Sequence, residues 1–319
     1  MEAQRLAQHS VQNHAPIAME SGRPRNVGDE DTMFETQGAT FCYVAFPKIA
    51  QTGVNGSTIE VDSLVLSDPT ETSFHLTQTS VVYNGGAYHP LLDAFNVSLN
   101  LAGSTTPYAY ITIPSLVAAA QATTNIDQEV QIANLEAFTE YNIAVVTSET
   151  ININLNGSTW LHEEKFPATK VNYDKTVTMK GLNNLSGFNL TSFQILTEPE
   201  ADGTNMIGTV YIPNPSVMTI SMGNVTFNNF VAGTFVGTSS LENLVLKPGN
   251  NNLSMKSAVN QTLIIGLVTT TYTDGIVPID VVGNSSVYNG VHLTYFEQAL
   301  AANTQHIKLN VLSALGGGI

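Results

Sequence analysis

Apolar and polar residues alternate along several short segments of the chain, with the period of two that is typical of a β-strand. In residues 151–156, isoleucine or leucine alternates with asparagine, and residues 307–311 alternate Ile, Leu and Val with Lys and Asn. Residues 188–190 and 210–212 fit the same pattern. Such alternation indicates strands with one face in a core and the other in water. We predict that the core contains Ile151, Ile153, Leu155, Phe188, Leu190, Ile212, Ile307 and Leu309, with Asn152, Asn154 and Asn189 facing outward.

Turn-forming residues separate these segments. Clusters at residues 84–86, 202–203, 247–250 and 289–290 combine Asn, Asp, Gly and Pro, which favour tight turns. Many short strands between such turns are typical of antiparallel β-sandwiches. The pattern therefore predicts an all-β fold of tandem antiparallel β-sandwiches with few short helices.

Helical periodicity is confined to a few segments. Residues 135–146 and 292–304 place apolar side chains at helical spacing, and each predicts a helix packed on a sheet. Residues 116–122 (LVAAAQA) fit either a strand or a short helix. Residues 39–46 form a short apolar patch, which we interpret as the first strand.

Two sequence landmarks recur at roughly domain length. Phe46-Pro47 returns as Phe166-Pro167, and the run ITIPS at residues 111–115 is matched by VYIPNPS at residues 210–216. A repeat of this length indicates tandem copies of one fold, and 319 residues fit about two domains of about 150 residues. We predict a disordered polar tail at residues 1–38, a first β-sandwich domain at 39–163, and a second with a C-terminal extension at 164–319.

Charge and hydropathy exclude several functions. The chain carries 11 Lys and Arg against 26 Asp and Glu, a formal net charge of −15, and all its arginines lie within the first 25 residues. A nucleic-acid binder needs clustered cations to displace counterions from phosphates, so we expect no nucleic-acid partner. The longest apolar runs, such as residues 263–268, are far shorter than the ~20 residues of a membrane span. No apolar leader segment opens the sequence.

Catalytic and metal-binding motifs are absent from the sequence. His162-Glu163-Glu164 begins like a zinc-protease motif, but Phe166 stands where the second histidine would be. Cys42 is the single cysteine and has no partner in the sequence for a disulfide. We interpret the acidic pairs at 163–164 and 198–200 as solvated loop charges, and we expect no catalytic residue, metal or cofactor.

Two further sets of residues invite a structural interpretation. Lys165, Lys170, Lys175 and Lys180 recur every five residues, a spacing that alternates faces on a strand. We interpret them as solubilising and edge-protecting charges. Trp160, the single tryptophan, is interpreted as a packing residue at the junction between the two domains.

Asparagine is abundant and falls repeatedly in the N-x-S/T pattern of glycosylation acceptors. Few charges combined with many such sequons suit a lumenal or extracellular surface. The alternative is that Asn and Thr decorate turns and strand faces. The glycosylation candidates are Asn55, Asn96, Asn156, Asn184, Asn189, Asn224, Asn252, Asn260 and Asn284.

Four runs carry a resemblance to a known family: FPKIAQ (46–51), STIEVDSLVLSDPTETSFHL (57–76), TPYAYITIPS (106–115) and KFPATKVNYDKTVTMKGLNNLSGFNLTSFQIL (165–196). They resemble a fungal family of membrane-anchored, vacuole-associated proteins of unknown function. The lumenal part of that family resembles tandem type-2 late-embryogenesis-abundant (LEA, water-stress) domains. The resemblance implies a cytosolic tail, one membrane helix and a glycosylated lumenal region, and it supplies no catalytic residues.

This sequence departs from the family pattern in one place. The helix that should precede residue 43 is missing, and residues 39–46 resemble its remaining end. The resemblance implies membrane association in full-length members, whereas we expect the chain as written to contain no span and to be soluble. The localisation it implies is the lumenal side of the fungal vacuole membrane, or the secretory pathway.

Three functions from different classes fit these observations. The first is a non-enzymatic accessory or structural β-sandwich protein of the fungal vacuolar or secretory membrane system, and it predicts no deep pocket. The alternative is a lipid or apolar-ligand-binding module, which predicts an elongated apolar groove between sheets. The third is a glycan-acting enzyme, which predicts two carboxylates roughly 5–9.5 Å apart in a cleft.

Overall fold

The computed structural model describes residues 41–312, and from Cys42 onward these residues form one compact unit. The predicted tail at residues 1–38 lies outside the described residues. The fold is built mainly of β-strands in two sheets, which confirms the predicted all-β class with few short helices. The helical elements are η1 (Phe41–Ala45, a π-helix), α2 (Phe46–Gly56), α3 (Leu135–Thr147), η2 (Asn183–Leu185, a 3₁₀-helix), α4 (Gln261–Thr270) and α5 (Thr294–Ala301).

The smaller sheet, sheet B, has the strand order β5-β4-β8-β3-β6, with β9 paired to the other edge of β8. All its pairings are antiparallel. The longest pairing joins β8 to β9 through twelve residue pairs, from Thr150–Lys180 to Leu161–Thr169. Its strands are β3 (Leu91–Leu92), β4 (Phe95–Leu101), β5 (Ala109–Ile113), β6 (Leu116–Val117), β8 (Thr150–His162) and β9 (Thr169–Lys180).

The larger sheet, sheet A, runs β10-β11-β14-β13-β12-β1-β2-β7, with β15 beside β12 and with β16 and β17 beside β15. Its one parallel pairing joins β1 to the first residues of β12, at Leu64–Met218, Val65–Thr219 and Leu66–Ile220. Its strands are β1 (Thr58–Ser67), β2 (Ser73–Tyr83), β7 (Gln121–Gln131), β10 (Asn189–Ile195), β11 (Met206–Asn214), β12 (Met218–Val231), β13 (Thr234–Leu246), β14 (Gly249–Val259), β15 (Ile276–Tyr288), β16 (Val291–His292) and β17 (Gln305–Asn310).

The two sheets form a sandwich in the first half of the chain. Strands β1, β2 and β7 of sheet A face sheet B, and buried side chains such as Leu66, Phe74, Leu99 and Ile153 meet between them. We call this part the first sandwich. The later strands of sheet A, from β10 onward, enclose a second apolar core with α4, and we call this part the second lobe.

The predicted strand faces are correct. Ile151, Ile153, Leu155, Ile212 and Leu309 are buried, while Phe188, Leu190 and Ile307 are half-buried and pack against the same core. Asn152 and Asn189 are exposed, and Asn154 is partly exposed on the outward face of β8. The register that the alternation predicted is therefore the register of the fold.

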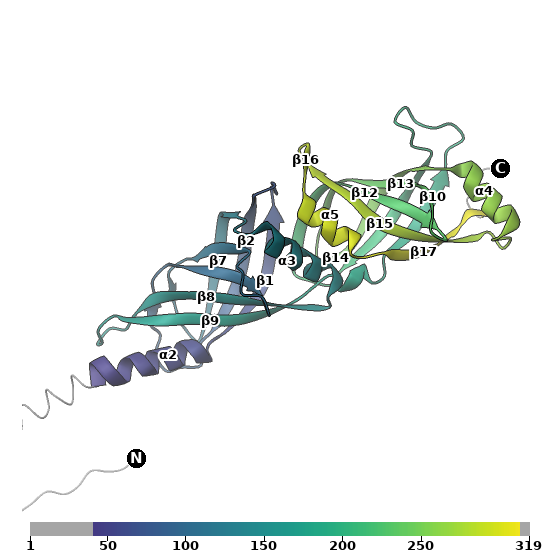
Figure 1. Ribbon diagram of the computed structural model, residues 1–319. Coiled ribbons are helices and arrows are strands. Elements are labelled where there is room, and N and C mark those ends of the chain that lie inside the picture. The colour runs from purple at the N-terminus through teal and green to yellow at the C-terminus, as the bar shows by residue number, and fades with distance from the viewer. Residues whose placement is uncertain (1–40, 313–319) are drawn as a thin grey trace, which may run out of the picture. The chain divides into compact units, whose positions relative to one another are not determined.

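The two predicted helices are confirmed as α3 and α5. Asn134 caps α3 by accepting a hydrogen bond from the backbone N–H of Ala137 at 2.8 Å, which satisfies one free donor of the first turn. The two helices pack together (Figure 1), and the rings of Phe138 and Tyr295 lie 4.9 Å apart. Residues 116–122, which fitted either a strand or a helix, form β6 and the start of β7.

The predicted first strand at residues 39–46 is wrong, because residues 41–45 form η1 and Phe46 begins α2. Residues 39 and 40 lie outside the described residues. Pro47 occupies the first turn of α2, where its missing N–H would have had no helical partner. Phe46, Ala50 and Val54, spaced four residues apart, form one buried helix face. The apolar patch therefore begins a helix whose buried face continues past the patch itself.

The repeated Phe-Pro landmarks occupy different structures. Phe46-Pro47 opens α2, whereas Phe166-Pro167 lies in the connection between β8 and β9. The second pair of landmarks does share a structure, since residues 109–113 form β5 and residues 206–214 form β11. The predicted domain boundary between residues 163 and 164 falls in the same β8–β9 connection, between two strands that pair in sheet B.

Candidate functional site: an apolar cavity in the first sandwich

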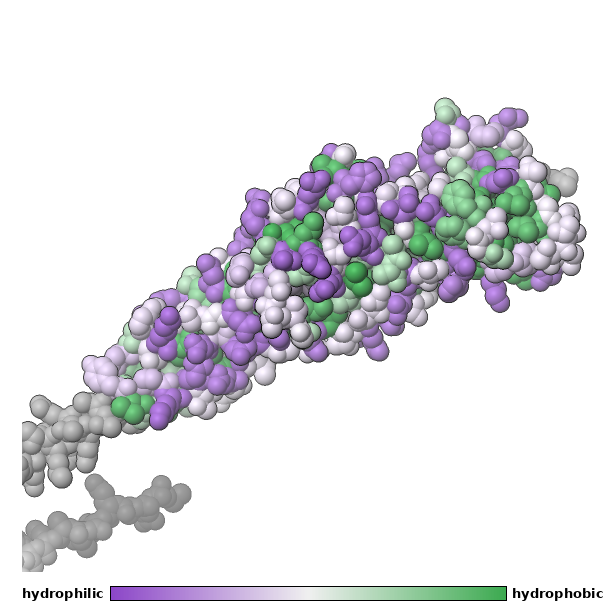
Figure 2. All heavy atoms as spheres, in the orientation of Figure 1, coloured by the Kyte–Doolittle hydropathy of each residue, from purple (hydrophilic) through white to green (hydrophobic). Residues whose placement is uncertain are grey.

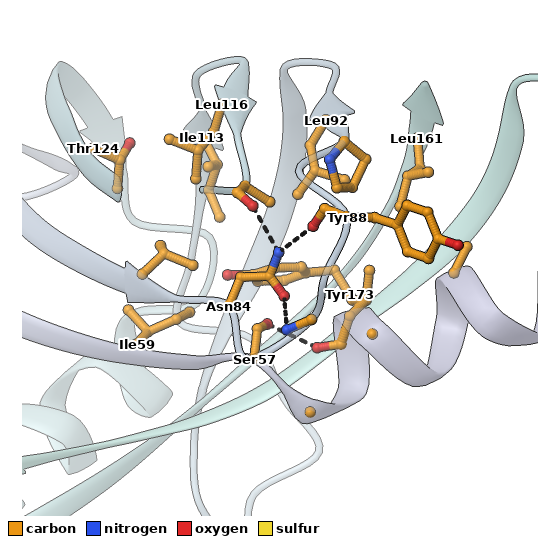
Figure 3. A pocket seen from close by; sticks show the side chains of 18 of the residues that line it. Ser57, Ile59, Asn84, Tyr88, Leu92, Ile113, Leu116, Thr124, Leu161 and Tyr173 are labelled. Carbon is orange, nitrogen blue, oxygen red and sulfur yellow. Dashed lines mark hydrogen bonds between the residues drawn. The ribbon is translucent and has the colours of Figure 1, made fainter. Parts of the chain in front are cut away.

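The first sandwich encloses a cavity of about 700 Å³. This volume lies within the ~300–1,000 Å³ that is typical of small-molecule sites. Most of the lining is apolar and comes from both sheets and from α2 (Figure 3). The apolar side chains that line it include Phe46, Ala50 and Val54 of α2, Ile59, Val82 and Ile126 of sheet A, and Leu92, Phe95, Ile111, Ile113, Leu155, Leu161 and Tyr173 of sheet B.

The cavity reaches solvent beside α2 and the loop that follows β2. Lys48 and Ile49 on α2 and Tyr88 on the loop line the cavity, and all three are exposed. Deeper in the cavity, Ile111 and Ile126 are buried. The mouth therefore combines exposed apolar side chains with one ammonium group.

Asn84 fixes the loop at the mouth. Its Nδ2 donates to the carbonyl oxygens of Tyr88 at 2.8 Å and Ala118 at 2.6 Å, and its Oδ1 accepts from the backbone N–H of Gly86 at 2.9 Å (Figure 3). One side chain thus holds the loop against the segment that precedes β7. This use of an asparagine side chain in place of backbone partners is common in turns.

Helix α2 forms one wall of the cavity and is fastened to β9. The Nε2 of Gln51 donates to the carbonyl oxygen of Asn172 at 2.9 Å, and the N–H of Asn172 donates to Oε1 of Gln51 at 2.8 Å. The Gln51 side chain thus bonds both backbone groups of Asn172, which on the edge strand β9 have no neighbouring strand to pair with. At the start of the helix, Phe46 stacks on Phe166 with ring centroids 4.3 Å apart.

Lys175 is not the solubilising charge that the spacing of the lysines predicted. It lies on the core face of β9 and is buried, and its Nζ donates to the carbonyl oxygens of Val54, Asn55 and Ser57 at the end of α2. A helix leaves its last carbonyls without helical partners and carries partial negative charge there. Lys175 therefore caps the helix that closes the cavity, while Lys170 and Lys180 face outward.

Three polar side chains interrupt the apolar inner face of sheet A. Gln78 and Ser80 of β2 and Thr124 of β7 all line the cavity. Ser80 lies directly opposite Thr124 in the antiparallel register, and the Nε2 of Gln78 donates to Oγ of Ser80 at 2.8 Å. The Oγ1 of Thr124 is buried and has no hydrogen-bond partner among the described residues.

Few charges reach the cavity. Among the residues that line it, Lys48 is the cation and Glu163 the single carboxylate. Burial raises the pKa of the Tyr173 hydroxyl, so this group is neutral at physiological pH. The lining therefore lacks the pair of carboxylates that acid–base hydrolysis of a glycan would use.

Two of the titratable residues singled out from the sequence, His162 and Glu200, lie close to a residue of opposite charge type. His162 Nε2 lies 3.0 Å from Asp93 Oδ2, and Glu200 Oε2 lies 3.2 Å from Lys256 Nζ. Within residues 41–312, no group of three or more His, Cys, Asp and Glu is arranged to hold a metal ion. Cys42 lies in η1 as a free, half-buried thiol.

Trp160 does not have the packing role predicted for it. Its side chain lies on the outward face of β8, opposite Lys170 of β9, and is 50% exposed. The alternation of β8 explains this position, because the core side chains of that strand are those at 159 and 161.

All nine glycosylation candidates are exposed. The five asparagines that are buried within residues 41–312, in contrast, all lie outside sequons: Asn100, Asn142, Asn214, Asn229 and Asn251. The visible face of the molecule is largely hydrophilic, with apolar residues in small groups (Figure 2). The candidates lie in α2 (Asn55), β4 (Asn96), β8 (Asn156), η2 (Asn184), β10 (Asn189), β12 (Asn224), β14 (Asn252), β15 (Asn284) and at the N-cap of α4 (Asn260).

The fold brings two pairs of these candidates together. Ser98 lies opposite Asn156, so Asn96, two residues away on β4, is a diagonal neighbour of Asn156 on the outer face of sheet B. In the second lobe, the Nδ2 of Asn284 donates to Oγ1 of Thr226, the hydroxyl residue of the Asn224 sequon, at 3.1 Å. No helix among residues 41–312 has the length and apolar character needed to cross a bilayer.

Comparisons with known proteins add a family match over part of the chain. A family described as a protein of unknown function (DUF3712) matches residues 106–229. This segment runs from just before β5 into β12 and includes the cavity residues Ile111, Ile113 and Thr124. A search among curated proteins finds none that is similar to this chain.

Solved structures show only distant similarity. One is the solution structure of a late embryogenesis abundant (LEA) protein, with 17% identity and a TM-score of 0.23, covering 51% of this chain and 97% of that chain. Another is a Mobiluncus mulieris adhesin with intramolecular disulfide, isopeptide and ester bond cross-links, with 10% identity, a TM-score of 0.21 and coverage of 72% and 80%. Red sea bream transglutaminase follows at 12% identity and a TM-score of 0.20, covering 89% of this chain and 34% of that one. Similarity at this level carries no functional argument.

Proposed function

We propose that the first sandwich is a binding module for a lipid or another elongated apolar ligand, and that it binds rather than catalyses. The observation that carries this proposal is the cavity of about 700 Å³ between the two sheets. Close packing normally leaves few voids larger than a water molecule. Apolar lining with a few polar groups is the usual composition of a ligand pocket. Of the functions considered from the sequence, the lipid or apolar-ligand-binding module is the one that predicts an apolar cavity between the sheets.

A binding assay with a matched pair of variants tests the proposal. Leu116 lines the cavity from β6, whereas its neighbour Val117 points outward and is 53% exposed. Nile red fluorescence should rise in the presence of the wild-type chain and fall when long-chain ligands displace the dye. Leu116→Trp should lower dye affinity about tenfold or more by filling the cavity, while Val117→Trp should leave it within about twofold.

Two outcomes would contradict the binding function. If the wild-type protein neither takes up Nile red nor carries a lipid in native mass spectrometry, the cavity does not bind apolar ligands. Equal loss of dye binding in both tryptophan variants would mean that the dye binds the outer surface. Matching thermal transitions of the two variants are the control for correct folding.

The exposed sequons support a second, compatible proposal: the folded region lies in the lumen of the fungal vacuolar or secretory system and carries N-glycans. The family resemblance adds association with the vacuole membrane in full-length members. An enzyme can attach a glycan only to an exposed asparagine, and every sequon asparagine is exposed. The asparagines that are buried in the described part of the chain all lie outside sequons.

Expression in a fungal host, with a signal peptide added to direct the chain into the secretory pathway, tests this second proposal. The purified chain should lose mass on endoglycosidase treatment. In the Asn156→Gln variant the mass that is lost should be smaller by the mass of one glycan. Asn152→Gln, on the same outward face of β8 but outside a sequon, is the matched control and should change nothing. Unchanged mobility of the wild-type chain, once it has been directed into the secretory pathway, would overturn the proposal that these sequons carry N-glycans.

A further inference from the structure

The inner wall of the cavity contains a polar site within an apolar surface. On β2, the side chains that face sheet B alternate as Phe74, Leu76, Gln78, Ser80 and Val82, so the apolar series is broken by two polar residues. On β7, the corresponding inward residues near the cavity are Thr124 and Ile126. Figure 3 shows Thr124 at one side of the drawn residues, with Tyr88 and Leu161 at the other.

Thr124 has an unmet hydrogen-bonding capacity. Its side chain lines the cavity, the residue is 8% exposed, and its Oγ1 has no partner among the described residues. Most buried hydroxyl groups have a hydrogen-bond partner, because leaving one without a partner is unfavourable. The lining of this largely apolar cavity thus retains a hydroxyl group that lacks a partner among residues 41–312.

Ser80 lies beside Thr124 and also has capacity to spare. The two residues are a directly opposed cross-strand pair, so their Cβ atoms lie about 4.5–5.5 Å apart. The Oγ of Ser80 accepts a hydrogen bond from Gln78 at 2.8 Å, which leaves its own hydrogen available. Two adjacent hydroxyl groups can together donate to and accept from one oxygen atom of a ligand.

The charges around the cavity decide what kind of ligand group fits there. Lys48 is exposed at the mouth, and Glu163 lies beyond the end of β8 in the segment that packs against α2. Sheet A contributes no charged side chain to the lining. A carboxylate, phosphate or ammonium group at Ser80 and Thr124 would therefore be buried without a counterion, which is strongly unfavourable.

We infer that the cavity binds a long-chain ligand whose uncharged oxygen-bearing group, a hydroxyl or an ester carbonyl, lies at the inner wall against Ser80 and Thr124. This inference rests on the proposed apolar-ligand function and adds the chemistry of the ligand and its orientation. The apolar chain of the ligand lies against Ile111, Ile113 and Phe95, and the polar group is the end that enters deepest.

Matched sixteen-carbon probes test the inference by displacement of Nile red. Hexadecane measures the chain alone, hexadecanol adds a hydroxyl, methyl hexadecanoate adds an ester carbonyl, and hexadecanoate adds a charge. The wild-type chain should bind hexadecanol or methyl hexadecanoate about fivefold or more tightly than hexadecane, the factor for roughly one net hydrogen bond. The alcohol and ester arms distinguish the two oxygen chemistries.

Variants of the polar site then assign the contact. Thr124→Val keeps the side-chain shape and removes the hydroxyl, and it should abolish the preference for the oxygen-bearing probe while leaving hexadecane affinity within about twofold. Ser80→Ala should reduce the same preference. Thr123→Val, at the exposed neighbouring position of β7, is the control and should leave every affinity unchanged.

The outcomes separate this inference from the function it rests on. If the wild-type chain binds none of the probes, the proposed function itself fails. If all four probes bind and Thr124→Val shifts them equally, or shifts none, the polar site is occupied by water and the inference is overturned. It is also overturned if hexadecanoate binds most tightly and Lys48→Gln weakens it, because the polar end then lies at the mouth.

Discussion

Lys175 shows how one side chain determines the wall of the cavity. An ammonium group is rarely buried unless it is paired or fully hydrogen-bonded. Lys175 meets this requirement through the carbonyl oxygens of Val54, Asn55 and Ser57 at the end of α2. The same contacts fix α2 across the first sandwich, so a residue of β9 positions a helix that lies more than a hundred residues earlier in the sequence.

Replacement of this lysine should destabilise the fold. Lys175→Met keeps a long side chain on the core face but leaves the final carbonyls of α2 without their donor, so we expect the free energy of unfolding to fall by about 1–3 kcal/mol. Lys170→Met, at an exposed position of the same strand, should change it by no more than about 0.5 kcal/mol. Denaturant titration of both variants measures the difference, and equal effects would contradict the capping role.

The charge of Lys175 also predicts a pH dependence. Burial lowers the pKa of this lysine below its usual value of 10.5, and Asp174 partly offsets the effect. Between the lowered pKa and 10.5 the unfolded chain binds more protons than the folded chain, so this residue's contribution to stability grows as pH rises through that interval and is lost as pH falls. The stability of wild type relative to Lys175→Met should therefore increase as the pH rises through the interval that ends at the usual lysine pKa of 10.5. A relative stability that decreases over this interval would contradict the assignment.

The inward position of Lys175 could have been read from the sequence. Val171, Tyr173, Val177 and Met179 alternate along β9, and the same alternation places residue 175 among them. The regular spacing of five residues between the lysines concealed this position, because that spacing relates the lysines to one another and not to the apolar residues of the same strand. Thr124, in contrast, has no such signal, since threonine is favoured in strands generally and its neighbours Thr123 and Asn125 are also polar.

At the scale of elements, strands with strict alternation were predicted correctly, and helices at the ends of apolar patches were not. The pattern in residues 151–156 specifies the faces of β8 because its period is that of a strand and its two sides differ clearly in polarity. Helix α2 was missed because its buried residues, Phe46, Ala50 and Val54, form a narrow stripe that overlaps the apolar patch by one residue. Helix α4 was missed as well, since its apolar run of six residues fits a buried strand equally well.

The alternation of β8 makes a direct prediction for stability. Ile153 is 3% exposed between the two sheets, so Ile153→Ala should lower the free energy of unfolding by about 2–5 kcal/mol through lost burial and a residual cavity. Asn152→Ala, on the outward face, should change it by no more than about 0.5 kcal/mol. Denaturant titration compares the two, and a larger effect at Asn152 would mean that the register of β8 is shifted by one residue.

At the scale of the whole molecule, the cavity could not be predicted from sequence patterns. Its lining comes from α2, from both sheets and from the loop after β2, so residues from Phe46 to Tyr173 meet there. Most of these residues have the polarity of an ordinary core position. The void exists because α2 and the two sheets leave space between them, and no local pattern encodes that spacing. From the sequence, an apolar-ligand-binding module was one of three hypotheses, and an apolar groove between the sheets was the feature that distinguished it from the other two.

The pairing of β1 with β12 makes a prediction about unfolding of the entire chain. Three residue pairs join the first sandwich to the second lobe in one continuous sheet, and β12 also pairs with β13 and β15. Unfolding of the first sandwich would remove the β1 partner of residues 218–220, where Met218 and Ile220 are buried, and would leave this edge of β12 without its backbone hydrogen bonds, which is unfavourable for buried backbone groups. We therefore expect the two parts to unfold in one cooperative transition.

Trp160, the single tryptophan, lies in β8 and its fluorescence reports on the first sandwich alone, whereas far-ultraviolet circular dichroism reports on both parts. Denaturation curves from the two signals should coincide, and a fluorescence transition that clearly precedes or follows the dichroism would show that the two parts unfold independently.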